Sequence, residues 1–141
     1  MSDLGGDSAC WAHLFDERDG EAKSVRGGLV VSLGEVKERG NGAVWSLPHG
    51  GDLDANLVRL EPDASIGEHI NDEVDVLVFV QSGNGSLHLE DDRVDLASDH
   101  LALIPKGARR SVTAGPTGLT YLSVHRRRGP LSIARSEPSD V

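Results

Sequence analysis

The chain has 141 residues, a length that favours one domain with its own core. Its 23 acidic and 14 basic side chains give a formal net charge of −9, and aromatic residues make up only 4% of it. Nucleic-acid-binding proteins need a basic surface and stacking rings, so nucleic acid is not expected as a partner. No stretch approaches the roughly 18 consecutive apolar residues of a membrane-spanning helix, so a membrane is not expected either.

The N-terminal residues and the cysteine content favour the cytoplasm. Met1–Cys10 contains no basic region that leads into an apolar run, as a secretory signal would. Cys10 is the only cysteine, so it cannot form a disulfide within the chain or a cysteine zinc site. We therefore expect a cytoplasmic protein.

Three regions are predicted along the chain. Residues 1–28 are polar and acidic and form an N-terminal arm, residues 29–135 form a single β-barrel domain, and residues 136–141 form a disordered tail. Within the domain, short apolar runs alternate with turn residues at spacings of about 8–15 residues, which is typical of an all-β sandwich or barrel. The runs expected as strands are Leu29–Leu33, Ala43–Leu47, Asn56–Leu60, Val74–Val80, Ser86–Leu89, Leu101–Ile104, Arg110–Thr113, Leu119–Val124 and Leu131–Ile133.

The most apolar of these strands is followed by a glycine-rich stretch. Gly83–Gly85 is predicted as a hairpin turn, and Gly115–Gly118 as a second turn further along. Before the first turn, alternation places Val76 and Val78 on one face of the strand and Phe79 on the other. Because both faces are apolar, this strand is expected to be central and covered on both sides.

Two segments carry a family resemblance. The first, Leu60–Asp75, reads LEPDASIGEHINDEVD and leads through an apolar strand to Gly83. The second, Asp99–Arg110, reads DHLALIPKGARR. They resemble the two motifs of the cupin superfamily: glycine, five residues, His-x-His, three or four residues, Glu, six residues and Gly; then glycine, five residues, Pro-x-Gly, two residues and His. The resemblance covers residues 53–125 and implies an all-β fold, the cupin-type double-stranded β-helix or jelly-roll barrel.

The residues at the family's metal-binding positions differ from the motif. Metal-binding cupins use three histidines and a glutamate, which suit iron, manganese, nickel or zinc. Here His69 keeps the first histidine position, and Asn71 stands at the second. The glutamate position falls on Asp75 with a three-residue gap and on Val76 with a four-residue gap, and Arg110 stands at the last histidine position.

Arg110 weighs against a metal at this site. A guanidinium is permanently charged and has no lone pair to donate, so it cannot ligate a cation and would repel one. We therefore predict no metal and no cofactor at the usual cupin position. Two roles stay open for Arg110: a buried ion pair with Asp75, or a bidentate grip on a carboxylate, enolate or phosphate.

The resulting hypothesis is a metal-free cupin that binds a small anionic molecule in its barrel. It would act as a binding protein or as a metal-independent isomerase, epimerase or cyclase, and whether it is an enzyme stays open. The candidate catalytic residues are His69, as acid or base, and Arg110, as anion anchor. The candidate substrate-binding residues are Asn56, Asn71, Asp75 and Arg110.

Two alternatives are kept. One is a metal-dependent cupin enzyme such as a dioxygenase, with a divalent transition metal held by His69, Asp75 and an off-motif histidine, namely His88, His100 or His125. The other is a non-catalytic module with a filled barrel that serves oligomerisation or partner contact.

A homodimer is the partner that the resemblance implies. Cupins of this kind commonly add N-terminal strands to the sheet of a second copy. Leu29–Leu33 and the preceding arm would be available for this.

Overall fold

The computed structural model describes residues 22–127 apart from 26, 38, 49 and 50. Contacts group the chain into two units, Met1–Glu38 and Arg39–Val141. In the first unit, β1 (Ala22–Val25) pairs antiparallel with β2 (Gly28–Val31), and a 3-10 turn, η1 (Leu33–Glu35), follows. The predicted strand at 131–133, the tail and most of the arm lie outside the described residues, so the predicted domain bounds stay predictions.

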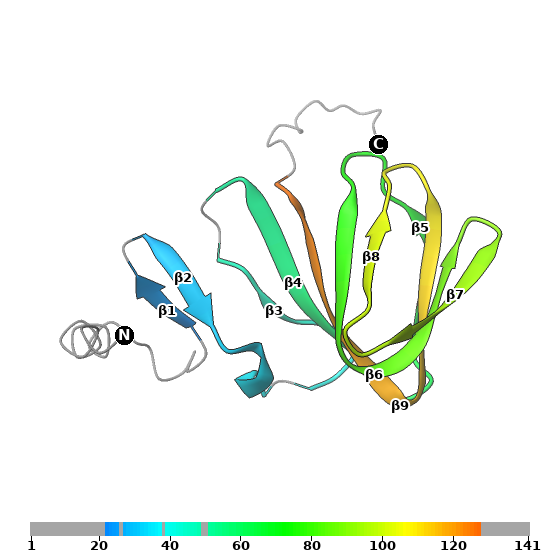
Figure 1. Ribbon diagram of the computed structural model, residues 1–141, viewed down its shortest axis with the longest axis horizontal. Coiled ribbons are helices and arrows are strands. Elements are labelled where there is room, and N and C mark those ends of the chain that lie inside the picture. The colour runs from blue at the N-terminus through cyan, green and yellow to red at the C-terminus, as the bar shows by residue number, and fades with distance from the viewer. Residues whose placement is uncertain (1–21, 26, 38, 49–50, 128–141) are drawn as a thin grey trace. The chain divides into compact units, whose positions relative to one another are not determined.

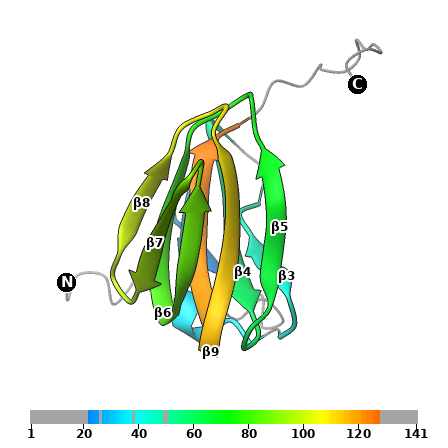
Figure 2. The same cartoon turned by 90° about the vertical axis from the view of Figure 1, so that its right-hand side faces the viewer.

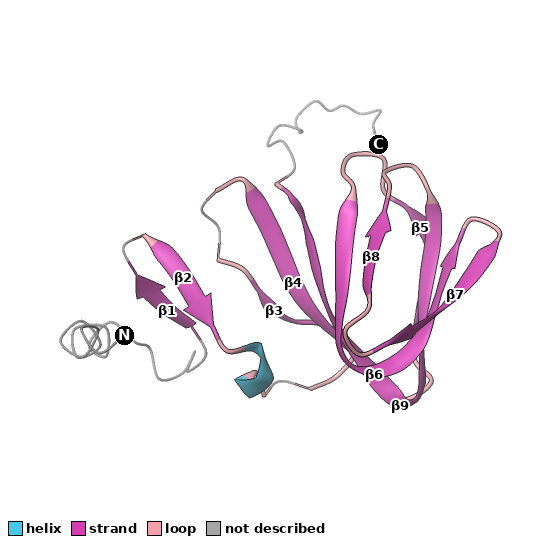
Figure 3. Cartoon of the chain, in the orientation of Figure 1, coloured by secondary structure: helices cyan, strands magenta, loops and turns pink. Residues whose placement is uncertain are grey.

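The second unit is an antiparallel sheet of seven strands folded over on itself (Figures 1 and 3). The strand order is β3-β4-β9-β6-β7, with β5 paired to β9 and β8 paired to β6. This confirms the all-β prediction, and no helix among the described residues is long and apolar enough to cross a membrane. The strands are β3 (Gly42–Ser46), β4 (Leu53–Leu60), β5 (Ser65–Ile70), β6 (Val76–Leu89), β7 (Asp92–Ala97), β8 (Leu101–Ile104) and β9 (Arg109–Arg126).

Two long strands, β6 and β9, make the fold of the sheet possible. They pair with each other over most of their length and curve together, so each belongs to both layers (Figures 1 and 2). The predicted turns at Gly83–Gly85 and Gly115–Gly118 are therefore wrong, because both strands continue through them. Gly83 has a φ of 82° and lies so close to the Gly118 carbonyl that a Cβ would clash with it. These glycines bend the strands without ending them.

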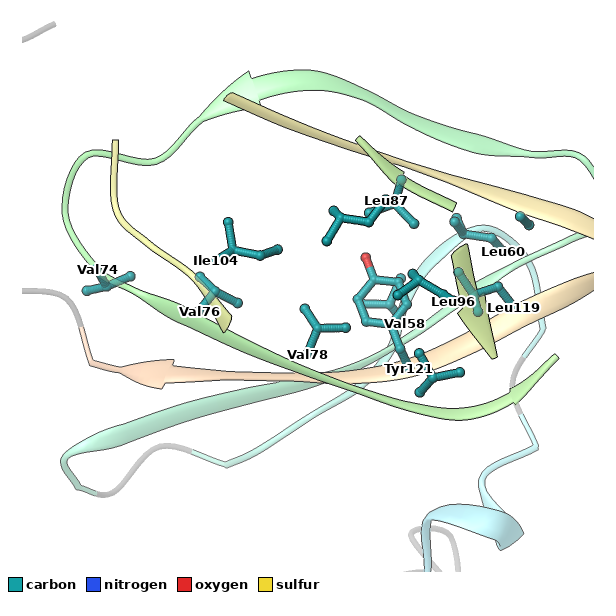
Figure 4. Packing of buried hydrophobic residues seen from close by; sticks show 13 residues of the cluster. Val58, Leu60, Val74, Val76, Val78, Leu87, Leu96, Ile104, Leu119 and Tyr121 are labelled. Carbon is teal, nitrogen blue, oxygen red and sulfur yellow. The ribbon is translucent and has the colours of Figure 1, made fainter. Parts of the chain in front are cut away.

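The interior between the two layers is filled mainly with aliphatic side chains. Val76, Val78 and Val80 of β6 point inward, as the alternation predicts, and Val112 and Ala114 of β9 face them from the other layer. Figure 4 shows the packing around Tyr121. The buried cluster consists of Val58, Leu60, Val74, Val76, Val78, Val80, Leu87, Leu96, Ile104, Val112, Ala114, Leu119 and Tyr121.

The opposite face of β6 is not covered in the described part of the chain. Leu77 remains 42% exposed and Phe79 40% exposed. The prediction that this strand is covered on both sides is therefore wrong for the residues that the structure describes, although the alternation itself is right.

Tyr121 places a polar atom inside the apolar cluster. The residue is only 6% exposed, and its hydroxyl has no hydrogen-bond partner among the described residues. Burial raises the pKa of Tyr121 to about 12, because the interior disfavours the phenolate.

The titration of Tyr121 tests this packing, since the chain has a single tyrosine and tyrosinate absorbance reports it alone. In the native protein we expect a midpoint near pH 12, and in denaturant a return to about 10. Burial of the neutral Tyr121 side chain contributes fully to the free energy of unfolding below about pH 10. As the pH rises through the pKa of the folded state, the free energy of unfolding falls by roughly 2–3 kcal/mol. In Tyr121→Phe this part of the alkaline loss disappears. A native midpoint near 10 would contradict the burial.

Candidate functional site

Two connections at one end of the barrel carry most of the candidate positions. Residues 71–75 join β5 to β6, and residues 105–108 join β8 to β9. The Gly107 amide donates to the Asn71 carbonyl at 2.7 Å, and the Lys106 amide donates to the Asp75 carboxylate at 2.8 Å. The two connections are thus joined by two hydrogen bonds at this end of the barrel, and residues of the two motifs form both of them.

Asn71 folds its own connection. Its side-chain oxygen accepts the amide of Glu73 at 2.8 Å and the amide of Val74 at 3.3 Å. This is the local pattern by which asparagine stabilises a turn. The side-chain oxygen of Asn71 is therefore in use, and its NH₂ group is the part left to meet a ligand.

The structure decides between Asp75 and Val76 at the family's glutamate position. Val76 is 9% exposed and shares the inward face with Val78, whereas Asp75 is exposed. The four-residue gap therefore applies, and an aliphatic side chain occupies the position. The buried ion pair between Asp75 and Arg110, one of the two roles left open for Arg110, is not formed, because Asp75 lies at the surface and bonds to the Lys106 amide.

Arg110 is a buried cation. It is 5% exposed, because it lies on the face of β9 that carries Val112 and Ala114 into the core. Its Nε donates to the Ala108 carbonyl at 2.9 Å and one Nη to the Pro105 carbonyl at 3.3 Å. No carboxylate among the described residues forms an ion pair with it. Desolvation lowers the pKa of Arg110, which still leaves the group charged at neutral pH.

His69 lies on β5 directly opposite Arg110 on β9. Directly paired residues point to the same side of a sheet with Cβ atoms about 5 Å apart, so the imidazole and the guanidinium share a face. His69 is nevertheless exposed, while Arg110 is covered. Its Nδ1 lies 2.9 Å from the Gly67 carbonyl. A carbonyl can only accept, so this contact assigns the proton to Nδ1 and leaves Nε2 free to accept one.

Asn56 lies in the other layer, on β4. It shares the face of Val58 and is half-buried, and its side-chain oxygen accepts the Ser46 hydroxyl at 2.6 Å. Its neighbour on β9 is Ser123. In the part of the chain that the structure describes, no hydrogen bond joins Asn56 to His69, so the structure does not bring these two candidates into contact.

The neighbour of Arg110 has opposite surroundings. Arg109 points outward and contacts Glu68 at 3.0 Å, Glu90 at 3.3 Å and Asp91 at 3.5 Å. The hydrogen bond to Glu68 contributes most to raising the pKa of Arg109. A surface pocket of about 240 Å³ lies beside this cluster, and His88 forms part of its wall. The sequence analysis missed the cluster, because its members come from three separate strands and connections.

The off-motif histidines of the metal-dependent alternative are dispersed. His88 is exposed on the outer face of β6 opposite Ser111. His100 accepts the Ala97 amide through Nδ1 at 3.1 Å, and the Nδ1 of His125 lies 2.8 Å from the Arg126 carbonyl. Among the described residues, no three His, Cys, Asp or Glu side chains are grouped to hold a metal ion. With asparagine, valine and arginine at three of the four family positions, the donor set does not fit a divalent cation.

Comparison with known proteins gives a clear answer for the fold. No family model and no curated protein matches the sequence. The cupin domain of Cnp3 from Schizosaccharomyces pombe matches with a TM-score of 0.62 and 16% identity, covering 74% of this chain and 77% of that one. A protein with a double-stranded β-helix domain from Klebsiella pneumoniae matches with a TM-score of 0.61 and 19% identity, covering 69% and 88%. KdgF from Halomonas sp. matches with a TM-score of 0.56 and 18% identity, covering 63% and 81%. At these identities the likeness is one of architecture, and the chain has the fold of the cupin superfamily, the double-stranded β-helix, as its two motifs predicted.

Proposed function

We propose that this protein binds a small anionic molecule at Arg110, without the metal that many cupins carry. One observation supports this proposal above all: a cation that is 5% exposed has no carboxylate partner among the described residues. Burying an ion without a counter-ion costs several kcal/mol. An anion from solution would offset that cost, so the site favours a negatively charged ligand.

The hydrogen bonds of Arg110 suit such a ligand. The Ala108 and Pro105 carbonyls hold Nε and one Nη, which fixes the plane of the guanidinium. The group has five N–H donors, and these two bonds leave the edge between the two Nη atoms for a ligand. That edge matches the two oxygens of a carboxylate, an enolate with its neighbouring carboxylate, or a phosphate.

His69 supplies the second chemical group. Its Nε2 is free to accept a proton when Nδ1–H donates to the Gly67 carbonyl, so the imidazole could act as a general base. With a substrate that carries a proton beside its carbonyl, Nε2 would take that proton, and the electron pair left behind would move onto oxygens held by Arg110. Return of the proton to another carbon or to the other face gives an isomer or epimer.

The remaining polar candidates would orient the ligand. Asn71 would offer its NH₂ group, whereas Asp75, which lies at the surface, would only hold the 105–108 connection through the Lys106 amide. Asn56 would act from the opposite layer, and the Tyr121 hydroxyl, which has no hydrogen-bond partner among the described residues, would be a further donor in the interior. A cytoplasmic location is part of the same proposal, and it rests on the single cysteine.

A non-catalytic role is the second candidate, and the apolar interior favours it. Aliphatic side chains surround Tyr121, and Arg110 ties the 105–108 connection through two carbonyls. In this second role Arg110 only stabilises the 105–108 connection through its two hydrogen bonds. The two readings differ in a measurable way, because a fastening arginine does not make the protein bind anions.

The binding proposal predicts which of two adjacent arginines matters. Calorimetric titration of the wild type with succinate, pyruvate and inorganic phosphate should detect binding of at least one. Arg110→Met should weaken that binding at least tenfold, and Arg110→Lys should fall between, because lysine keeps the charge but loses the two-pronged geometry. Arg109→Met is the matched control, since Arg109 is already surrounded by three carboxylates, and it should bind like the wild type.

Stability provides the control for folding. Replacing an unpaired buried charge by an apolar side chain of similar volume is often neutral or stabilising, so Arg110→Met should unfold at an equal or higher denaturant concentration in buffer without small anions. Binding that survives in Arg110→Met, or a wild type that binds none of the three probes, would leave only the fastening role.

The metal-free part of the proposal has its own measurement. Elemental analysis of protein purified without chelators, from cells supplied with iron, manganese, nickel and zinc, should find well below one ion per chain, since the donor set at the family positions is incomplete. A near-stoichiometric metal that is lost in His69→Ala would instead support the metal-dependent enzyme.

A further inference from the structure

Three polar side chains lie on the inward face of the layer opposite Arg110. Tyr121 and Ser123 are alternate residues of β9, and Tyr121 belongs to the buried cluster, so both side chains point inward. Asn56 on β4 is directly opposite Ser123 and shares the inward face of Val58. We call Asn56, Tyr121 and Ser123 the interior polar strip.

The interior polar strip carries hydrogen-bonding groups that the described part of the chain leaves unpaired. Tyr121 is only 6% exposed, Ser123 and Asn56 are half-buried, and no described residue bonds to either hydroxyl. The Ser46 hydroxyl donates to the side-chain oxygen of Asn56 at 2.6 Å, which leaves the NH₂ group of Asn56 without a partner among these residues. Two hydroxyls and one NH₂ group are thus available on a single face.

These unpaired groups need a reason, because their surroundings are aliphatic. On the neighbouring strand β6, Val78 is directly opposite Ser123 and Val80 is directly opposite Tyr121. Figure 4 shows the Tyr121 ring among the apolar side chains of the cluster. A hydroxyl or amide that loses water without gaining a hydrogen bond destabilises a protein, so buried polar groups are nearly always paired. The strip is therefore suited to hydrogen bonds with a molecule that enters the barrel.

The strip and the Arg110 guanidinium lie toward the same end of the barrel. β9 runs away from this end in one layer and returns to it in the other, so Arg110 and Ser123 each lie near one of its ends (Figures 1 and 2). At the C-terminal end of β9, Arg126 donates from Nη2 to the Glu73 carbonyl of the 71–75 connection at 3.0 Å. Sheets packed face to face lie about 10 Å apart, so a molecule of several carbon atoms bound at Arg110 can reach the strip.

We propose that the anion bound at Arg110 is a carboxylate whose carbon chain carries hydroxyl groups, and that the interior polar strip binds those hydroxyls. This inference rests on the anion site of the proposed function and names the class of its ligand. A hydroxyl both donates and accepts, so it can pair with the NH₂ group of Asn56 and with either hydroxyl of the protein. The strip carries no charge, which favours a neutral hydroxylated chain over a second carboxylate.

The strip would discriminate between acids that Arg110 alone treats alike. Water can bond to the strip in the free protein, and the hydroxyls of a ligand would replace those bonds one for one. An acid of the same length without hydroxyls displaces the water and offers no hydrogen bond in return, so its affinity is lower.

The test compares gluconate with hexanoate, two six-carbon monocarboxylates that differ in their hydroxyl groups, by calorimetric titration of the full-length protein. Gluconate should bind the wild type at least tenfold more tightly than hexanoate. In the double variant Tyr121→Phe with Ser123→Ala, gluconate should lose about tenfold in affinity, because two hydrogen bonds are removed. Hexanoate should bind this variant within twofold of the wild type or more tightly.

Two further variants serve as controls. Ser111→Ala removes a serine hydroxyl from the outward face of the same strand, opposite His88, and should leave both affinities unchanged. Tyr121→Phe alone removes a single oxygen atom and guards against misfolding. It should weaken gluconate binding about threefold while the circular dichroism spectrum stays that of the wild type.

Arg110→Met separates this inference from the proposed function, since both acids should lose at least tenfold in affinity in that variant. If both acids bind through Arg110 but gluconate has no advantage, the strip does not select hydroxyls and the inference is overturned while the anion site stands. The same holds if the double variant weakens both acids equally, if Ser111→Ala weakens gluconate as much, or if only succinate, pyruvate or phosphate binds. When none of these anions binds, the anion site fails as well.

Discussion

The placement of the Arg110 charge is the constraint on which the rest of the site depends. Strand alternation directs Arg110 inward beside Val112, and the same alternation directs Arg109 outward to three carboxylates. Two adjacent arginines thus have opposite electrostatic surroundings. For Arg109 the chain supplies the counter-charge, and for Arg110 the described residues supply only carbonyl dipoles. A buried cation solvated only by carbonyls is a site that still attracts an anion.

The connections around Arg110 are held together by hydrogen bonds of the chain itself. Asn71 stands at the family's second histidine position, and its side-chain oxygen accepts the amides of Glu73 and Val74. Asp75 stands beside the glutamate position, and its carboxylate accepts the Lys106 amide. Val76 adds an apolar side chain to the core at the position where metal-binding cupins have their glutamate. Hydrogen bonds within the chain therefore join these two connections, and the Arg110 guanidinium bonds to two carbonyls of the second one.

The two faces of strand β8 have different surroundings. Its outward residues, Leu101 and Leu103, are exposed to solvent, and its C-terminal end leads into the connection that holds the Arg110 guanidinium. The inward residue Ile104 belongs to the core.

The sequence predicted the fold class and β8 well, because apolar runs with alternation and the Pro105-x-Gly107 motif are local signals. It missed β5 and β7, whose residues are mostly exposed and polar, so that pairing with β9 and β6 defines them. It divided β6 and β9 at their glycines, since a bend and a turn have the same composition. The ion pair of Asp75 with Arg110 failed because a one-residue difference in register moves a side chain to the other face.

The most direct test of the central claim is a crystal structure of the protein grown with the carboxylate that it binds best. The account predicts two carboxylate oxygens of that ligand at hydrogen-bond distance from the two Nη atoms of Arg110, with the guanidinium still held by the Ala108 and Pro105 carbonyls. A carboxylate of the chain itself paired with Arg110, or the side chain turned out into solvent, would contradict it.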